Sequence, residues 1–317
     1  MALDHYVSQV HLKKFYSPAL GELMYAMRKS DLERFTPRAK SVCRLDEGNT
    51  NDYLTEPRAV EEFLKPVEGR YDAAISAFEA SKPNQNAIYA IAGFVSYILT
   101  CSPAAMRIAS GTFKADLKAA AKLKAAMEEI PTPPPELGGK ELAELLDSGA
   151  VKVEIDPKYP QAVGIAGILQ QVALFGNSKW DILINEHEDC PFFTSDFPVG
   201  SETTSNLPVL NRVVPLAPTV AVRITPNTNL GYGKVDFEFR HFSFERRKVK
   251  RQEAVNINRL LVQSAEDMVF FRDDQAWIPR FIEKNRHFRM ETETVEIPKP
   301  QGVVLWSRQT LKPFQRG

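Results

Sequence analysis

The sequence has few cysteines and no excess of either charge. Cys43, Cys101 and Cys190 are its 3 cysteines, and they lie far apart in the 317 residues. A sparse, odd set excludes a disulfide framework and is typical of a reducing compartment, so we expect a cytoplasmic protein. The 40 lysines and arginines equal the 40 aspartates and glutamates in number. This balance removes the overall field of a nucleic-acid or membrane binder, although a local patch can still contact phosphates.

Long apolar runs are also lacking. The opening Met-Ala-Leu-Asp-His has no basic stretch followed by an apolar one, so we expect no secretory signal. The most apolar window runs over residues 87–101 and is interrupted by Gly93 and Ser96. At about 15 residues it is shorter than the roughly 20 needed to cross a bilayer. We therefore expect a buried core helix there and no membrane partner.

The common nucleotide-binding and hydrolase motifs are missing too. The sequence contains no GxGxxG, P-loop, HExxH, paired CxxC or GxSxG. Other kinds of enzyme remain open. The composition, with 44% apolar and 25% charged residues, is that of an ordinary globular protein.

Helical periodicity dominates the first half of the chain. Apolar residues at helical spacing predict a first helix over 5–15, and Asp4 is expected to be its N-terminal cap. The same spacing predicts further helices along the first half of the chain. These are expected from 57 to 67 and on through 71–78, over 87–101, 112–130, 140–148 and 161–175. Prolines within 131–135 favour a loop between helices over a ligand for SH3-type domains.

Strand patterns dominate the second half. Segments 181–185 and 191–194 are predicted to pair, and 212–225 forms one or two strands interrupted by Pro215 and Pro218. The remaining expected strands are 235–244, 268–271 and a short one at 303–306, with a helix over 252–265.

This order predicts an α+β fold, in which a helical N-terminal half packs on a mixed, mainly antiparallel β-sheet in the C-terminal half. We expect one domain over 1–280, helical in 1–175 and sheet-rich in 176–280, followed by a charged C-terminal tail over 281–317.

Two segments combine polar residues of the kinds that catalysis uses. His5 and Gln9 stand four residues apart, which on a helix places them on one face, where they could move protons or hold a phosphate. The alternative is a histidine packed against the core. Ser195 and Asp196 end an apolar strand, where metal and general-base sites are often built; the alternative is a turn in which they bond their own backbone.

Two further segments offer binding chemistry. His187 and Cys190 could form half of a zinc site, although a polar turn with a buried thiol explains them as well. A basic run before the last predicted helix could bind the phosphates of a nucleic acid or nucleotide, or form a solvated face. It consists of Arg246, Arg247, Lys248, Lys250 and Arg251.

The chain resembles the domain-of-unknown-function family 4238 over about residues 4–272. Residues 5–9, His-Tyr-Val-Ser-Gln, resemble the family's opening "HYVPQ", and residues 193–199 are similar to its "FITSDNPV". The paired-glutamate helix of the family matches 60–80, with Glu61 or Glu62 and Glu68 at the corresponding positions. Weaker similarity covers 87–107, 214–218 and 258–270.

Two positions depart from the family pattern. Ser8 replaces a proline, and Phe197 stands where asparagine is usual. His5, Gln9 and Asp196 are retained. The family has no established activity, so the resemblance implies a fold and candidate positions rather than a reaction.

These residues together lead to a hypothesis of metal-assisted phosphodiester hydrolysis, as in a nuclease. Asp196 and Glu68 would hold Mg²⁺ or Mn²⁺, since hard cations prefer oxygen ligands. His5 would act as general base or hold the phosphate, Gln9 would orient water, and Ser195 would support Asp196. The alternatives are a non-catalytic ligand-binding or interaction protein, and a hydrolase of a small nucleotide or another phosphorylated metabolite.

Overall fold

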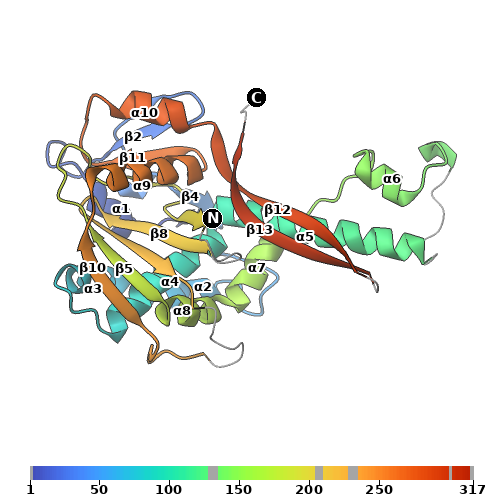
Figure 1. The fold of residues 1–317 in the computed structure, drawn as a ribbon, viewed down its shortest axis with the longest axis horizontal. Coiled ribbons are helices and arrows are strands. Elements are labelled where there is room, and N and C mark those ends of the chain that lie inside the picture. Colours follow the sequence, from blue (N-terminus) through green and yellow to red (C-terminus); the bar gives the residue numbers. More distant parts are fainter. Residues whose placement is uncertain (1–2, 128–134, 204–209, 228–234, 300–301, 315–317) are drawn as a thin grey trace.

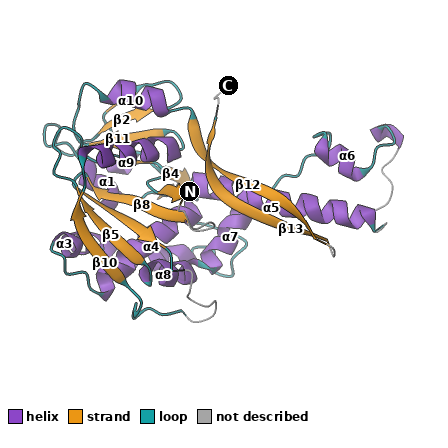
Figure 2. Cartoon of the chain, viewed as in Figure 1, coloured by secondary structure: helices purple, strands orange, loops and turns teal. Residues whose placement is uncertain are grey.

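A mixed five-stranded sheet runs through the body of the molecule in the computed structural model (Figures 1 and 2). The structure describes residues 3–127, 135–203, 210–227, 235–299 and 302–314. The strand order is β10-β5-β9-β8-β7, with β10 parallel to β5 and the other neighbours antiparallel. These strands are β5 (Lys179–Ile184), β7 (Gly200–Thr203), β8 (Leu210–Ala217), β9 (Val220–Thr225) and β10 (Ser243–Lys248).

Helices from the first half of the chain cover one face of this sheet. Trp180 on β5 is fully buried there and stacks on Phe78, with ring centroids 5.3 Å apart. The longest apolar helix, α4, is buried along most of its length, as its composition predicts. The helices on this side are α2 (Ala59–Gly69), α3 (Tyr71–Glu79), α4 (Gln85–Cys101), α7 (Lys158–Ala166) and α8 (Ile168–Gly176).

The other face of the sheet packs against α9 (Arg251–Ser264), with Leu183 and Val213 contributed by the sheet and Ile257 by the helix. From α9 the chain enters a second sheet, of order β3-β2-β11-β6, in which all neighbours are antiparallel. Its strands are β2 (Tyr25–Arg28), β3 (Arg34–Phe35), β6 (Thr194–Ser195) and β11 (Met268–Phe271), with α10 (Ile278–Asn285) after them.

An arm projects from this body (Figure 1). It consists of the distal half of α5 (Pro103–Ala126), the short helix α6 (Leu142–Asp147) and a hairpin of β12 (Phe288–Lys299) and β13 (Gly302–Pro313). The hairpin is attached to α5 near its base, where the Thr292 hydroxyl donates to the carbonyl of Ile108 at 2.6 Å. The expected tail over 281–317 thus holds the end of α10 and this hairpin, and the strand expected at 303–306 lies within β13.

The α+β class, with helices mainly in the first half and strands in the second, is confirmed. The prediction for the first segment was wrong. His5 lies on a strand, β1 (Leu3–His5), paired with β4 (Arg44–Asp46), and α1 begins only at Gln9 and ends at Leu12. Asp4 does not cap a helix; its carboxylate binds the Arg58 guanidinium at 2.9 Å.

Three further expectations were also wrong. Thr194 lies in β6, which pairs with β11 in the second sheet rather than with β5. Residues 235–242 form a loop instead of a strand, and Phe239 adopts a positive φ of 53°. The helix expected over 161–175 is divided into α7 and α8, between which Gly167 lies.

Among the described residues, no single helix is both long and apolar enough to cross a membrane. Helices α4 and α5 meet such a test only as a pair, and they are bent by 60° relative to each other.

The loop around Phe239 depends on a glycine, and this gives a test of the fold. A Cβ placed on Gly176 would lie 2.2 Å from the Phe239 ring. We expect Gly176→Ala to lower the free energy of unfolding by about 1–3 kcal/mol through overpacking, measured by urea titration. Gly69 has no atom within 4 Å of a Cβ, so Gly69→Ala should cause no loss; equal losses in both variants would contradict this account.

Candidate functional site

A buried histidine connects the first helix to both halves of the fold. His11 on α1 is 0% exposed, and its Nδ1 lies 2.7 Å from the Tyr71 hydroxyl on α3. Its Nε2 lies 2.7 Å from the Thr194 hydroxyl on β6, and its ring stacks on Phe94. Burial lowers the pKa of His11 to about 3. The ring is therefore neutral at physiological pH, with one nitrogen as donor and the other as acceptor.

Ser195 and Asp196, which follow Thr194, also form hydrogen bonds within the protein. The Ser195 hydroxyl accepts a hydrogen bond from the Phe197 N–H at 3.2 Å, which is the turn that the sequence left as the alternative. The Asp196 carboxylate accepts from the N–H groups of Glu266 (2.8 Å), Asp267 (2.7 Å) and Met268 (2.8 Å). Asp196 is only 3% exposed. It therefore holds the turn between α9 and β11.

Lys29 holds the other side of that turn. It is 0% exposed, and its amine donates to the carbonyls of Ala265 (2.6 Å) and Phe288 (2.9 Å). A cation suits this place because the C-terminal end of α9 carries a partial negative charge. We call Lys29, Asp196 and the turn 265–268 between them the turn clamp.

The surroundings of Asp196 have opposite effects on the pKa of its carboxyl group. Burial raises the pKa of its carboxyl to about 6, while the backbone N–H donors and the Lys29 cation act to lower it. Burial raises the pKa of Tyr6 and of Cys43, and the nearby Asp196 charge raises both further. These neighbours make the clamp a dry, mainly structural environment.

His5 and Glu68 lie near each other. Burial lowers the pKa of His5, and the nearby Glu68 carboxylate acts to raise it. The Ser8 hydroxyl donates to Glu68, and the buried Nε2 of His5 has no hydrogen-bond partner among the described residues. Because His5 lies on β1, it does not share a helix face with Gln9, which begins α1 and is half-buried.

The proposed metal ligands do not form a recognisable metal centre. Within the described ranges, no group of three or more His, Cys, Asp or Glu side chains is arranged to hold an ion. Both oxygens of Asp196 already accept backbone N–H groups, which occupy three of the roughly four lone pairs of the carboxylate. This donor set does not fit Mg²⁺ or Mn²⁺, nor does it extend the His187 and Cys190 pair into a zinc site.

The basic run lies on β10 and at the start of α9, and much of its charge is neutralised by acidic neighbours. Arg247 binds Glu253 through two hydrogen bonds of 2.7 and 2.6 Å, Lys248 binds Glu186 at 2.8 Å, and Arg251 binds Asp189 at 2.8 Å. Arg246 and Lys250 are exposed. This arrangement is closer to the solvated face that the sequence left as the alternative.

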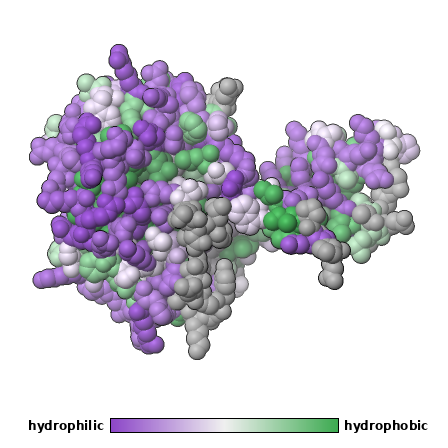
Figure 3. All heavy atoms as spheres, in the orientation of Figure 1, coloured by the Kyte–Doolittle hydropathy of each residue, from purple (hydrophilic) through white to green (hydrophobic). Residues whose placement is uncertain are grey.

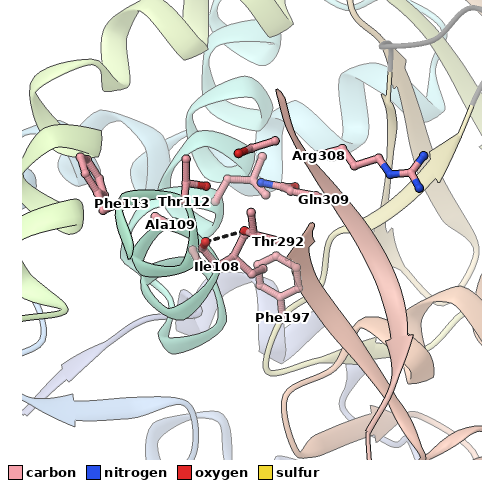
Figure 4. Close-up of a pocket in the computed structure, with 11 residues that line it drawn as sticks. Ile108, Ala109, Thr112, Phe113, Phe197, Thr292, Arg308 and Gln309 are labelled. Carbon is pink, nitrogen blue, oxygen red and sulfur yellow. Dashed lines mark hydrogen bonds between the residues drawn. The ribbon is translucent and has the colours of Figure 1, made fainter. Parts of the chain in front are cut away.

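A hollow of about 370 Å³ lies between α5 and the hairpin (Figure 4). One wall is apolar, and Phe197, the residue directly after Asp196, forms part of it. The opposite wall is polar and comes from the hairpin. The apolar wall comprises Leu99, Ala105, Ile108, Ala109, Phe113 and Phe197, and the polar groups are those of Thr112, Thr292, Ser307, Arg308 and Gln309.

The directions of two side chains of β13 determine whether a charged group faces the hollow. Gln309 extends into the hollow toward Thr112, and its buried Oε1 has no hydrogen-bond partner in the part of the chain that is described (Figure 4). Arg308 points away from the hollow, and its guanidinium binds Glu293. The described lining of the hollow thus offers an amide side chain, and its guanidinium is directed elsewhere.

A second hollow, of about 630 Å³, lies where β5 and β10 end. Glu186, His187, Glu188, Arg272 and Asp273 are among its lining residues. Several of these groups already have partners: Nε2 of His187 lies 3.1 Å from the Val249 carbonyl, and Arg272 binds Asp273 at 2.8 Å. Part of the described polar lining of this second hollow is therefore already committed to internal pairs.

Sequence reasoning missed His11 and Gln309. The signal for His11 was its place between Val10 and Leu12 in an otherwise apolar stripe. Gln309 carried no such signal, because the strand that presents it was expected only over 303–306.

A family model described as "Protein of unknown function (DUF4238)" matches residues 4–275. The matched segment contains the turn clamp and the α5 wall of the hollow, and it ends before the hairpin that forms the other wall. No curated protein and no solved structure is found to be similar to the chain.

The neutrality of His11 predicts a dependence of stability on pH. Its pKa is about 3 in the folded chain and lies near the ordinary histidine value of 6.5 in the unfolded chain. Below pH 6.5 the unfolded chain therefore binds a proton at His11 that the folded chain does not bind, and the His11 contribution to stability falls on acidification. The share due to His11 should approach about 1.4 kcal/mol per pH unit.

The measurement is urea unfolding between pH 7.5 and pH 5 for wild type and His11→Gln. The variant should be less stable throughout but should lose this share of the slope. His241 is exposed, so His241→Gln serves as the control and should follow wild type. A His11→Gln slope equal to that of wild type would contradict a neutral, buried His11.

The turn clamp predicts a large structural cost for removing its carboxylate. Asp196→Ala leaves three backbone N–H groups without their acceptor, so we expect the free energy of unfolding to fall by about 2–4 kcal/mol. Asp189, an exposed aspartate paired with Arg251, provides the matched control, and Asp189→Ala should cost far less, because an exposed ion pair adds little to stability. The free energies of unfolding of both variants would be measured by chemical denaturation at pH 7.5. A loss for Asp196→Ala as small as that for Asp189→Ala would refute the clamp.

Proposed function

The chain belongs to the DUF4238 family of unknown function, and from that premise we propose that it binds a small, uncharged, amphipathic molecule in the hollow between α5 and the β12–β13 hairpin. This is the ligand-binding alternative to hydrolysis. The observation that carries it is a hollow with an apolar wall on one side and uncharged polar side chains, among them Gln309, Ser307 and Thr292, on the other.

The size and lining of the hollow support this proposal. Its volume of about 370 Å³ falls within the range of small-molecule sites, roughly 300–1,000 Å³, which are mostly apolar with a few orienting polar groups. Phe197 adds to the apolar wall at the position where the family usually has asparagine. An aromatic or alicyclic ring would pack between Phe113 and Phe197.

The polar wall supports an uncharged ligand with a hydrogen-bond donor. A buried acceptor without a partner is costly, and rotation of the Gln309 amide would bring its Oε1 into the hollow, where a donor on the ligand would satisfy it. The Thr112 hydroxyl, on the other side of the hollow, can donate or accept. Since Arg308 is directed away and paired with Glu293, no full charge faces the ligand.

Phosphodiester hydrolysis stays a prediction from the sequence, together with the phosphorylated metabolite, the Mg²⁺ or Mn²⁺ cofactor and the nucleic-acid or nucleotide partner. It requires the buried Asp196 carboxylate, which already accepts three backbone N–H groups, to become accessible to water at one place together with His5, Gln9 and Glu68. The hollow requires no such rearrangement, and for that reason we favour ligand binding.

We also propose a cytoplasmic location. All three cysteines are buried free thiols. Unpaired cysteines are typical of a compartment in which thiols stay reduced.

Filling the hollow tests the proposal. A panel of neutral aromatic amides and alcohols would be screened against the full chain by ligand-observed NMR. Ala109 lines the hollow, so Ala109→Leu should abolish binding, while Ala120→Leu, at an exposed position of the same helix, should leave it intact. Gln309→Met removes the acceptor and should weaken binding about tenfold. No binder, or binders indifferent to Ala109→Leu, would overturn the proposal.

A further inference from the structure

We propose that the outward face of the β12–β13 hairpin is the interface of a two-fold symmetric dimer of this chain. The proposal does not depend on the hollow, which lies against the opposite face of the hairpin. It rests on which side chains the strand register places outward, on their exposure and on the order of charges along β12.

The register separates the hairpin into an inner and an outer face. Met290, only 1% exposed, and Thr292, which bonds the carbonyl of Ile108, face α5. Successive side chains of a strand alternate between faces. The outer face therefore carries Val295 and Ile297 on β12, with their directly paired neighbours on β13, Trp306 and Val304.

These four side chains form an exposed apolar patch, which we call the outer patch. Val295 is 43% exposed, Ile297 39% and Val304 48%, and Trp306 is half-buried. A hydrophobic surface is visible on the projecting hairpin beside the body (Figure 3). An apolar patch on a two-stranded ribbon that projects into solvent marks a surface that is covered in the working protein.

The order of side chains along β12 suits a second copy as the cover. On the outer face the order is Glu293, Val295, Ile297, Lys299. A two-fold axis at the level of Glu296 reverses this order between two facing hairpins. Val295 of each copy then lies over Ile297 of the other. Lys299 lies over Glu293, which already binds Arg308 and Lys312 of its own chain, so a third cation joins that carboxylate at each end of the patch.

The other strand is compatible with the same axis. Trp306 would lie over Val304 of the second copy, and Gly302 would lie over Arg308, where the absence of a side chain leaves room for the guanidinium that already binds Glu293. The arm also holds the hairpin tip away from the body (Figure 1). A contact of this kind uses the same patch on both copies. It therefore leaves no patch free for a third copy, and the assembly stops at a dimer without forming fibres.

The test is the mass of the full chain in solution. Sedimentation equilibrium should give twice the chain mass of 35.7 kDa. Ile297→Lys should raise the dimer dissociation constant at least about 30-fold, because the change enters the interface twice. Lys299→Glu should weaken the dimer less, by several-fold, and should remove its dependence on salt.

The matched control is Val303→Lys. Val303 is equally apolar and 55% exposed, but the register puts it on the inner face, so this variant should stay dimeric. Circular dichroism and thermal unfolding would establish that each variant is folded. A wild type that is monomeric up to about 100 μM, or a dimer that Ile297→Lys does not weaken more than Val303→Lys, would overturn the proposal.

Discussion

Two buried and oppositely charged side chains hold the turn between α9 and β11, and both sheets depend on that turn. Lys29 binds the carbonyl of Ala265 at the end of α9, and Asp196 binds the three N–H groups that follow it. The turn determines where α9 packs on the five-stranded sheet and where β11 enters the second sheet. Charges buried this deeply are tolerated because each is surrounded by backbone groups of the opposite polarity.

The same requirement explains why the Thr-Ser-Asp motif is polar although it is buried. Thr194 completes the partners of His11, Ser195 closes its own turn, and Asp196 holds the clamp. Residues of these types also build catalytic sites, which is why their pattern favoured hydrolysis when the sequence was the only guide. Distances to backbone groups, rather than residue types, separate the two uses.

Much of the fold could be predicted from local pattern, and most of the site could not. The apolar stretch that became α4 and the strand Met268–Phe271 were predictable because their periodicity agrees with their burial. Local spacing predicts a helix at His5, which is wrong. The strand that contains His5 forms by pairing with Arg44, nearly forty residues away, and local spacing carries no information about that contact. The partners of Asp196 are N–H groups of residues 266–268, and every residue type but proline supplies those.

The family model covers one wall of the hollow and ends before the other. The α5 wall and Phe197 lie inside the segment shared with the family, whereas Ser307, Arg308 and Gln309 lie beyond it. On the ligand-binding proposal, substitutions of these three β13 residues would therefore change which molecule fits without touching the side chains of Lys29, Asp196 or His11. Relatives that share the same architecture need not share a ligand, and selectivity can diverge among them while the scaffold stays unchanged.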